Sequence, residues 1–271
     1  MSPEPIVLLA RQRSGTNAAR LVLKTHSEIY DLGEVFDLGE RHSEYELKRA
    51  TNYFNFLTVY ADGDLARVFP DRHAVVFSDF LAYLKAFTDK RYLIIDVKYS
   101  TLHLLHEPHA SFGYPYLFNL IADHGLRVIQ ITRRNYLRYF LSVKKATASG
   151  VWQVEVGGEP VDEPILLDVP ELIRSLERCE QEDRMVSDFL GHYGRFLSQE
   201  YAEMVTPGGA GLDMHFLERI SAWLSIPNSF DNTLPILRQS YLPLPDAIEN
   251  FHEVAMALQN TRFAHCLDDE R

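Results

Sequence analysis

A segment near the N-terminus combines residue types that together can bind an anion. The apolar run 6–10 is long enough for a buried strand, and the polar run RQRSGTN at 11–17 follows it. Good helix formers come next, at 18–23. A strand, a small-residue turn and a helix start direct backbone N–H groups and the positive end of a helix dipole at one point. The segment therefore predicts an anion site, where Gly15 lets a ligand approach the backbone closely.

This loop departs from the triphosphate-binding loop that it partly matches. A Walker loop has a glycine, four residues and then Gly-Lys-Ser/Thr, whereas Gly15 is followed directly by Thr16. The cation stands instead at Arg13, two residues before the glycine. An ordinary strand, turn and helix with surface arginines fits the same residues, so the segment alone leaves both interpretations open.

A second arginine and a serine form another candidate anion site. The apolar segment 126–132 leads into Arg133 and Arg134, and Ser142 lies eight residues after Arg134. On a helix this spacing places Arg134 and Ser142 about two turns apart on nearby sides, where both can contact one phosphate. A guanidinium and a hydroxyl suit a phosphate dianion. The alternative is a solvated basic helix face, which would also include Arg138, Lys144 and Lys145.

Taken together, these segments resemble a known family. The run RSGTN at 13–17 is similar to the 5′-phosphosulfate loop, Lys/Arg-Ser/Ala-Gly-Ser/Thr-Thr, of sulfotransferases that use 3′-phosphoadenosine 5′-phosphosulfate (PAPS). Arg134 and Ser142 match the family's 3′-phosphate motif, although Tyr136 stands where proline is common. The segment 233–251 resembles the C-terminal block of the bacterial carbohydrate-type branch.

The resemblance implies that both phosphorylated ends of one nucleotide are held. The implied nucleotide-binding residues are Arg13, Ser14, Gly15, Thr16, Asn17, Arg134, Ser142, Arg238 and Gln239. Arg13 would contact the phosphosulfate and its bridging oxygen, and the rest of the loop would surround the 5′-phosphate. Charge builds on these oxygens during sulfuryl transfer, so fixed donors there lower the barrier. PAPS would be the co-substrate, and no metal is expected, because a sulfuryl group carries less charge than a phosphoryl group.

The resemblance also identifies groups that would act on the acceptor. Glu34 lies in a Gly-Glu-x-Phe context, where bacterial and heparan-type members carry their general base, and is the predicted base here. Lys98 ends the apolar run 92–98, where a lysine of this family often reaches the sulfuryl group. A solvated loop acid and a strand-end lysine are the alternatives for these two residues. His103 is the reserve base, because the cytosolic branch uses a histidine near this strand.

The elements that must position these residues alternate along the chain. Buried strands are predicted at 6–10, 92–98 and 126–132, with shorter ones at 75–77 and 195–198. Helices are predicted at 43–58, 79–87, 113–123, 135–148, 170–193, 214–224 and 246–259. This alternation predicts an α/β fold, a P-loop-like parallel sheet with helices on both faces. The segment 150–168 interrupts the pattern as a small hairpin insertion in a single domain, 1–271.

Composition limits the partners of the chain. The 271 residues are 46% hydrophobic and carry a net charge of −11. This acidity argues against a non-specific binder of nucleic acid or of anionic membranes, so an anionic ligand must meet local arginines and lysines. Two cysteines and the lack of an 18-residue apolar stretch favour a cytoplasmic protein without stable membrane insertion. The expected partner is a small-molecule or glycan acceptor, and nothing in the sequence indicates an oligomeric state.

The predicted function is transfer of a sulfuryl group from PAPS to an acceptor hydroxyl on a carbohydrate or glycolipid, with Glu34 as the base. One alternative is a Mg·ATP-dependent kinase, since the segment 93–96, LIID, resembles a Walker B strand. Another is a non-catalytic nucleotide-binding protein with the same loops. A metal site at His103, His106 and His109 is disfavoured, because Pro108 interrupts the helix and no carboxylates complete a ligand set.

Overall fold

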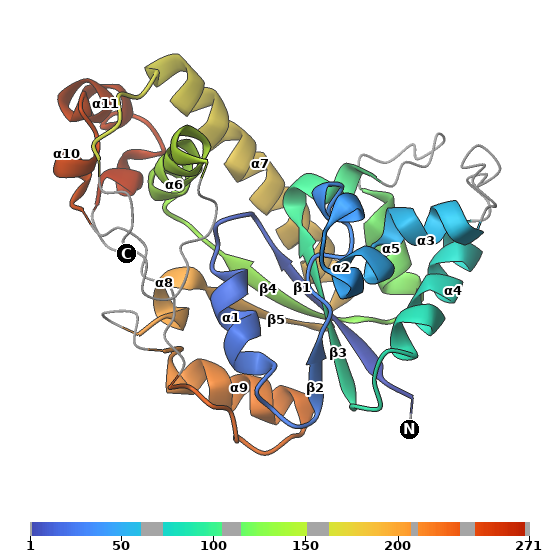
Figure 1. The fold of residues 1–271 in the computed structure, drawn as a ribbon. Coiled ribbons are helices and arrows are strands. Elements are labelled where there is room, and N and C mark those ends of the chain that lie inside the picture. Colours follow the sequence, from blue (N-terminus) through green and yellow to red (C-terminus); the bar gives the residue numbers. More distant parts are fainter. Residues whose placement is uncertain are drawn as a thin grey trace.

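A parallel sheet of five strands forms the centre of the protein. The computed structural model describes residues 2–60, 73–104, 115–150, 163–206, 211–233 and 242–268. The strands are β1 (Glu4–Ala10), β2 (Ile29–Asp31), β3 (Tyr92–Lys98), β4 (Arg127–Thr132) and β5 (Phe196–Glu200). Their order is β2-β3-β1-β4-β5, and every pairing is parallel. Helices cover both faces of the sheet (Figure 1), so the predicted α/β fold is confirmed.

Strand β1 lies in the middle of the sheet because its side chains are apolar on both faces. Ile6, Leu8 and Ala10 belong to one buried cluster, and Val7 and Leu9 belong to another on the opposite face. This is the alternation that a strand imposes when both faces are covered.

Different helices cover the two faces. One face packs against α1 (Thr16–Leu23), the short α8 (Tyr201–Met204) and α9 (Met214–Leu224). The other packs against α3 (Tyr53–Tyr60), α4 (His73–Lys85), α5 (Tyr116–Asp123) and the C-terminal half of α7 (Val169–Tyr193). Along the chain, the 3₁₀ helix η1 (Gly39–His42) and the short α2 (Glu46–Thr51) come between β2 and α3, and the 3₁₀ helix η4 (Tyr99–Leu104) comes directly after β3.

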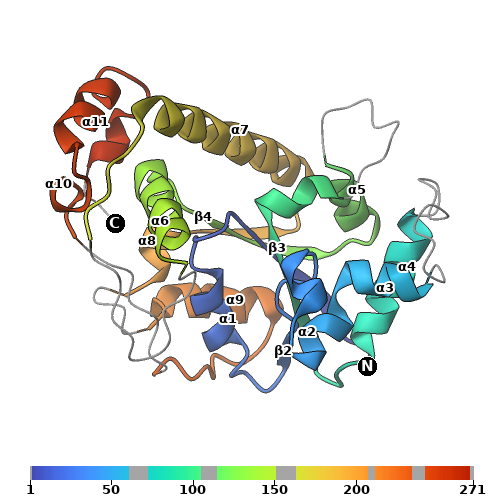
Figure 2. The same ribbon diagram turned by 45° about the horizontal axis from the view of Figure 1, so that its top comes forward.

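A third apolar cluster forms at the other end of α7. Leu172 and Leu176, near the start of α7, pack with residues of α6 (Tyr136–Ser149), α10 (Leu244–Ala247), α11 (Phe251–Leu258) and the 3₁₀ helix η5 (Ala264–Leu267). These helices lie beside one another in both ribbon views (Figures 1 and 2). Helix α7 therefore joins the sheet to the C-terminal helices.

Three sequence predictions need correction. The segment 75–77 is not a strand but part of α4, because Val76, Phe80 and Leu84 are buried at helical spacing. The helix predicted at 43–58 breaks at Asn52, whose side chain accepts hydrogen bonds from the N–H groups of Phe54 and Asn55. The helix predicted at 246–259 is divided into α10 and α11.

The predicted hairpin insertion at 150–168 falls mostly on residues 151–162, which lie outside the described part of the chain. Just after it, Ile165 makes a single parallel bridge with Ile248. Within the described residues, no helix is both long and apolar enough to cross a bilayer.

The sheet register brings the candidate site residues to one edge. Ala10, the last residue of β1, pairs with Lys98 of β3 and with Ile131 of β4. Since these strands are parallel, the loop after β1 and the residues that follow β4 lie at the same carboxyl edge as Lys98.

Candidate active site

The loop between β1 and α1 has the backbone geometry of an anion site. Arg13 and Gly15 both have positive φ angles, 60° and 79°. Helix α1 begins without a side-chain cap, so its first N–H groups donate to no capping side chain. The Ser14 hydroxyl is fully buried and finds no hydrogen-bond partner among the described residues. Where residues with left-handed and right-handed backbone conformations alternate, successive N–H groups point toward one position. This arrangement can bind an anion.

Tyr201 packs against this loop from the start of α8. A Cβ placed on Gly15 would lie 2.5 Å from Tyr201 Cε2, so no side chain fits there. The Arg133 guanidinium lies 5.1 Å from the centre of the Tyr201 ring, and its Nη1 donates to the Arg13 carbonyl at 2.8 Å. Arg133 and Tyr201 therefore hold the loop from outside.

We expect Gly15→Ala to lower the free energy of unfolding by about 3 kcal/mol, from left-handed strain together with the clash against Tyr201. Gly194→Ala is the matched control, because Gly194 has a φ of 77° and open space around its Cα. The control should lose only about 1 kcal/mol. Urea denaturation measures both, and equal losses would contradict the close approach of Tyr201.

Arg13 directs its guanidinium toward α6. Its Nε donates to Ser142 Oγ at 2.9 Å, so two residues predicted to bind different phosphates contact each other in this structure. Burial lowers the pKa of Arg13 below its usual value, while Tyr201 opposes that shift. An anion bound in the loop would favour the charged form of this half-buried guanidinium and so oppose the lowering of its pKa.

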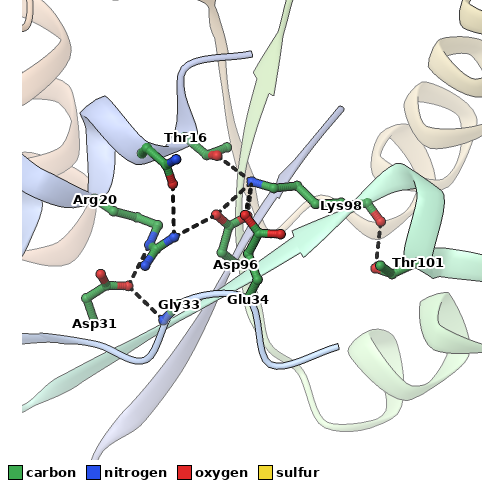
Figure 3. A network of polar contacts seen from close by, with 9 residues as sticks. Thr16, Arg20, Asp31, Gly33, Glu34, Asp96, Lys98 and Thr101 are labelled. Atoms are coloured by element: carbon green, nitrogen blue, oxygen red, sulfur yellow. Dashed lines mark hydrogen bonds and ion pairs between the residues drawn. The ribbon is translucent and has the colours of Figure 1, made fainter. Parts of the chain in front are cut away.

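Lys98 and Glu34, predicted from separate segments, contact each other. Lys98 is almost fully buried at the end of β3, and its Nζ lies 3.4 Å from Glu34 Oε1. The same ammonium donates to Thr16 Oγ1 and to both carboxylate oxygens of Asp96, at 2.8 and 2.7 Å (Figure 3). The end of the anion loop and the candidate base are therefore linked through one cation.

Glu34 has the electrostatic setting of a proton acceptor. Burial raises the pKa of its carboxyl above the ordinary value, and Asp96 and Asp37 add to the increase. Lys98 and, more weakly, Arg20 act in the opposite direction. A carboxylate whose pKa is raised takes up a proton more readily than an exposed one, which suits a general base near neutral pH.

Arg20 and Asp96 belong to the same polar network, but the sequence did not assign them to the site. Arg20, one turn into α1, contacts Asp31 Oδ1 at 2.8 Å and Asp96 Oδ2 at 3.3 Å, and donates to Asn17 Oδ1 at 3.2 Å (Figure 3). The sequence relates Asp96 only to a Walker B carboxylate. Its position two residues before Lys98, on the same face of a strand, was the available signal for their pairing.

Arg134 lies at the carboxyl edge as predicted but faces solvent. Its side chain is 83% exposed, and its Nε lies 3.5 Å from Glu200 Oε2. The backbone N–H of Arg134 donates to Glu200 Oε1 at 3.0 Å, and the Thr132 hydroxyl donates to Oε2 at 2.7 Å. Burial raises the pKa of Glu200 above its usual range, against these donors. A carboxylate therefore lies where the second phosphate was predicted.

Arg11 anchors the start of the loop to α7. This buried guanidinium lies 3.1 Å from carboxylate oxygens of both Glu182 and Asp183 and donates to the Cys179 carbonyl at 2.6 Å. Three tyrosine rings surround it at 5.2 to 5.4 Å, those of Tyr99, Tyr136 and Tyr139. These contacts hold the start of the loop from the face of the sheet opposite to the one on which Lys98 lies. The apolar pattern of the strand gave no reason to expect this role for Arg11.

The structure brings most of the predicted residues to one edge of the sheet. Arg13, Ser14, Gly15, Thr16, Asn17, Glu34, Lys98, Arg134 and Ser142 all lie on or beside the ends of β1, β3 and β4. Arg238, Gln239, His106 and His109 lie outside the described residues. His103, the reserve base of the sequence analysis, is exposed on η4. The residue that contacts Glu34 from this part of the chain is Lys98. In the described segments, no three His, Cys, Asp or Glu residues are grouped so that they could hold a metal ion.

This chain was compared with known protein families, curated proteins and solved structures. No family model matches the chain, and no curated protein does. Among solved structures, the chain is similar to a crystal structure of a sulfotransferase from Alicyclobacillus acidocaldarius. The alignment has a TM-score of 0.48 at 13% sequence identity and covers 98% of this chain and 97% of the other. A similarity at this level assigns neither an activity nor a residue role to the present chain.

Proposed function

We propose that this protein is a PAPS-dependent sulfotransferase that transfers a sulfuryl group to a hydroxyl of a carbohydrate or glycolipid. One juxtaposition carries the proposal. An uncapped helix start, with the Ser14 hydroxyl that has no partner among the described residues, lies beside an ion pair between Lys98 and the half-buried Glu34. Sulfuryl transfer needs both features, an anion site for the donor and a base for the acceptor.

The loop residues fit the donor's 5′ end. The buried Ser14 hydroxyl and the N–H groups at the start of α1 supply donors, and Arg13 and Lys98 supply positive charge. Fixed donors aimed at oxygens where charge develops lower the barrier without reorganising during the reaction. PAPS, when bound, would supply the activated sulfuryl group at this point.

Glu34 would remove the proton of the acceptor hydroxyl as its oxygen forms a bond to sulfur. The sulfuryl group leaves the phosphate oxygen in the same step, and the released adenosine 3′,5′-bisphosphate keeps the negative charge. Lys98, which contacts Glu34, would donate to the sulfuryl oxygens of the bound donor. The proton ends on Glu34, whose raised pKa favours that transfer.

A ligand-dependent stability assay tests the proposed donor. Adenosine 3′,5′-bisphosphate without Mg²⁺ should raise the melting temperature, because a ligand that binds only the folded state stabilises it by about 2.7 kcal/mol at 100 times its Kd. Stabilisation that requires Mg·ATP would instead support the kinase alternative. Transfer of labelled sulfate from PAPS to a panel of glycans, glycolipids and phenols then identifies the acceptor, and binding without any transfer would leave a non-catalytic nucleotide-binding protein.

We expect Arg134→Ala to weaken binding of adenosine 3′,5′-bisphosphate by about 1.5–3 kcal/mol, the scale of a hydrogen bond to a charged group. The guanidinium is exposed at the edge of the sheet and would exchange Glu200 for the 3′-phosphate. Calorimetry measures the affinity, with adenosine 5′-phosphate as the control ligand, since it lacks the 3′-phosphate. Equal losses for both ligands would remove Arg134 from the 3′-phosphate site.

A further inference from the structure

Arg20 links three segments of the polar network behind Glu34. Its guanidinium donates to three acceptors on three different segments, Asp31 at the end of β2, Asp96 in β3 and Asn17 in its own helix (Figure 3). Burial alone would lower the pKa of Arg20, but Asp31 and Asp96 outweigh it and hold the pKa above its usual value. The side chain is only 17% exposed, so its protein partners leave little of it for a substrate.

The backbone before Glu34 is fixed through the partners of Arg20. The Gly33 N–H donates to Asp31 Oδ1 at 3.0 Å, the oxygen that Arg20 Nε also contacts. The Gly33 carbonyl accepts from the Asp96 N–H at 2.8 Å. Gly33 has a φ of 78°, and a Cβ there would lie 2.9 Å from Arg20 Nη2. The turn that presents Glu34 is thus held at the N–H group and the carbonyl of Gly33, and the Arg20 guanidinium packs against the Cα of this glycine.

We propose that Arg20 is a positioning residue for the candidate base: by bridging Asp31 and Asp96 it fixes the Gly33 turn and the Lys98 ammonium on either side of Glu34. This inference rests on the proposed role of Glu34. Lys98 and Asp96 face that carboxylate from β3, Asp37 from its own loop and Arg20 from α1. Of these four charged groups, removal of Arg20 leaves Lys98 as the one cation beside Asp96 and Asp37.

Two substitutions separate geometry from charge. Arg20→Gln removes both, so kcat should fall ~30-fold, the scale of a small misplacement of a catalytic group. The acid limb of the kcat profile should also move to higher pH, because Glu34 loses a nearby positive charge. Arg20→Lys keeps the charge but loses the planar fork that reaches three acceptors. It should leave the acid limb near the wild-type position while kcat stays low. In both variants KM for PAPS should change less than ~3-fold.

Arg91→Gln is the matched control. Arg91 also pairs with a carboxylate, Glu28 at 3.4 Å, but it precedes β3 and lies at the opposite end of that strand from Lys98. It should show wild-type kcat and an unshifted acid limb. If Arg20→Gln fails to fold, Asp31→Ala serves as the second variant, because it removes the acceptor shared by Arg20 and Gly33. Its kcat should fall by the same factor, and combining it with Arg20→Lys should add little, as expected for two residues in one linkage.

A titration that needs no turnover keeps this inference apart from the proposed function. The ¹³C carboxyl signal of Glu34, assigned by its loss in Glu34→Gln, should titrate at higher pH in Arg20→Gln than in the wild type. An unshifted signal, or a kcat within threefold of wild type in Arg20→Gln, overturns the role of Arg20. A shifted signal in a protein that transfers no sulfate would keep the linkage of Arg20 to Glu34 and reject the proposed function.

Discussion

Glu34→Gln should reduce sulfuryl transfer by about 10³-fold, within the range that a general base contributes. The amide keeps the size of the side chain but cannot accept the proton of an acceptor hydroxyl. Nucleotide affinity should stay close to wild type, because among the described residues Glu34 is linked to the loop through Lys98, which keeps Asp96 and Thr16 as partners. Single-turnover assays with labelled PAPS measure the first effect, and calorimetry with adenosine 3′,5′-bisphosphate measures the second.

The pH profile gives a second signature of Glu34. A base acts when it is ionised, so wild-type kcat should fall as pH drops through the pKa of Glu34. Because burial raises that pKa, the acid limb should lie above the ordinary glutamate value of about 4.3. Asp37→Asn is the control on the same loop. It should keep turnover and move the limb slightly to lower pH, because it removes one of the charges that raise the pKa.

Stability should respond in the opposite sense to activity. A carboxyl whose pKa is higher in the folded than in the unfolded state binds more protons when folded, so its contribution to stability is lost as pH rises through the folded pKa. At neutral pH the ionised Glu34 therefore costs stability, and Glu34→Gln should melt at or above the wild-type temperature. A variant that is inactive but less stable at pH 7 would point to a structural role for Glu34, and turnover within fivefold of wild type would remove it as the base.

Contiguous parts of the site could be predicted from sequence because their chemistry lies in one segment. The apolar run 6–10 and the polar run 11–17 together contain a strand, a turn and a helix start, and the structure has all three. The parallel sheet followed from the alternation of buried strands and helices, and its register placed Lys98 beside the loop. Local pattern was sufficient wherever the interacting groups are neighbours in the chain.

The remaining parts depend on contacts between distant segments. Arg20 pairs with Asp96 across 76 residues, and no periodicity in either segment reports that pairing. Of the adjacent Arg133 and Arg134, the first is buried against the loop and the second is exposed, an assignment that only the path of the chain after β4 decides. Strand β2 has three residues, too few to show an alternation. The segment 75–77 reads locally as a strand, but the apolar surface that it meets is arranged for a helix.

Lys98→Met should have the largest effect on stability, a loss of about 3–5 kcal/mol in the free energy of unfolding. Lys98 donates to both carboxylate oxygens of Asp96, which is itself fully shielded from solvent. Without the ammonium, Asp96 keeps Arg20, at 3.3 Å, as its remaining cation partner among the described residues, and a buried carboxylate is left poorly compensated. Turnover should also fall by about 10²–10³, as for loss of one donor to the developing charge.

A double variant separates these two contributions. Asp96→Asn combined with Lys98→Met removes the stranded charge together with its partner, and replacing a buried pair as a unit costs far less than breaking it. Stability in urea should therefore recover most of the loss, while turnover should not recover, because no ammonium remains to contact the sulfuryl oxygens. Recovery of both would make Lys98 a purely structural residue. Recovery of neither would place the lost stability in the contacts of the ammonium to Thr16 and Glu34, which the double variant also removes.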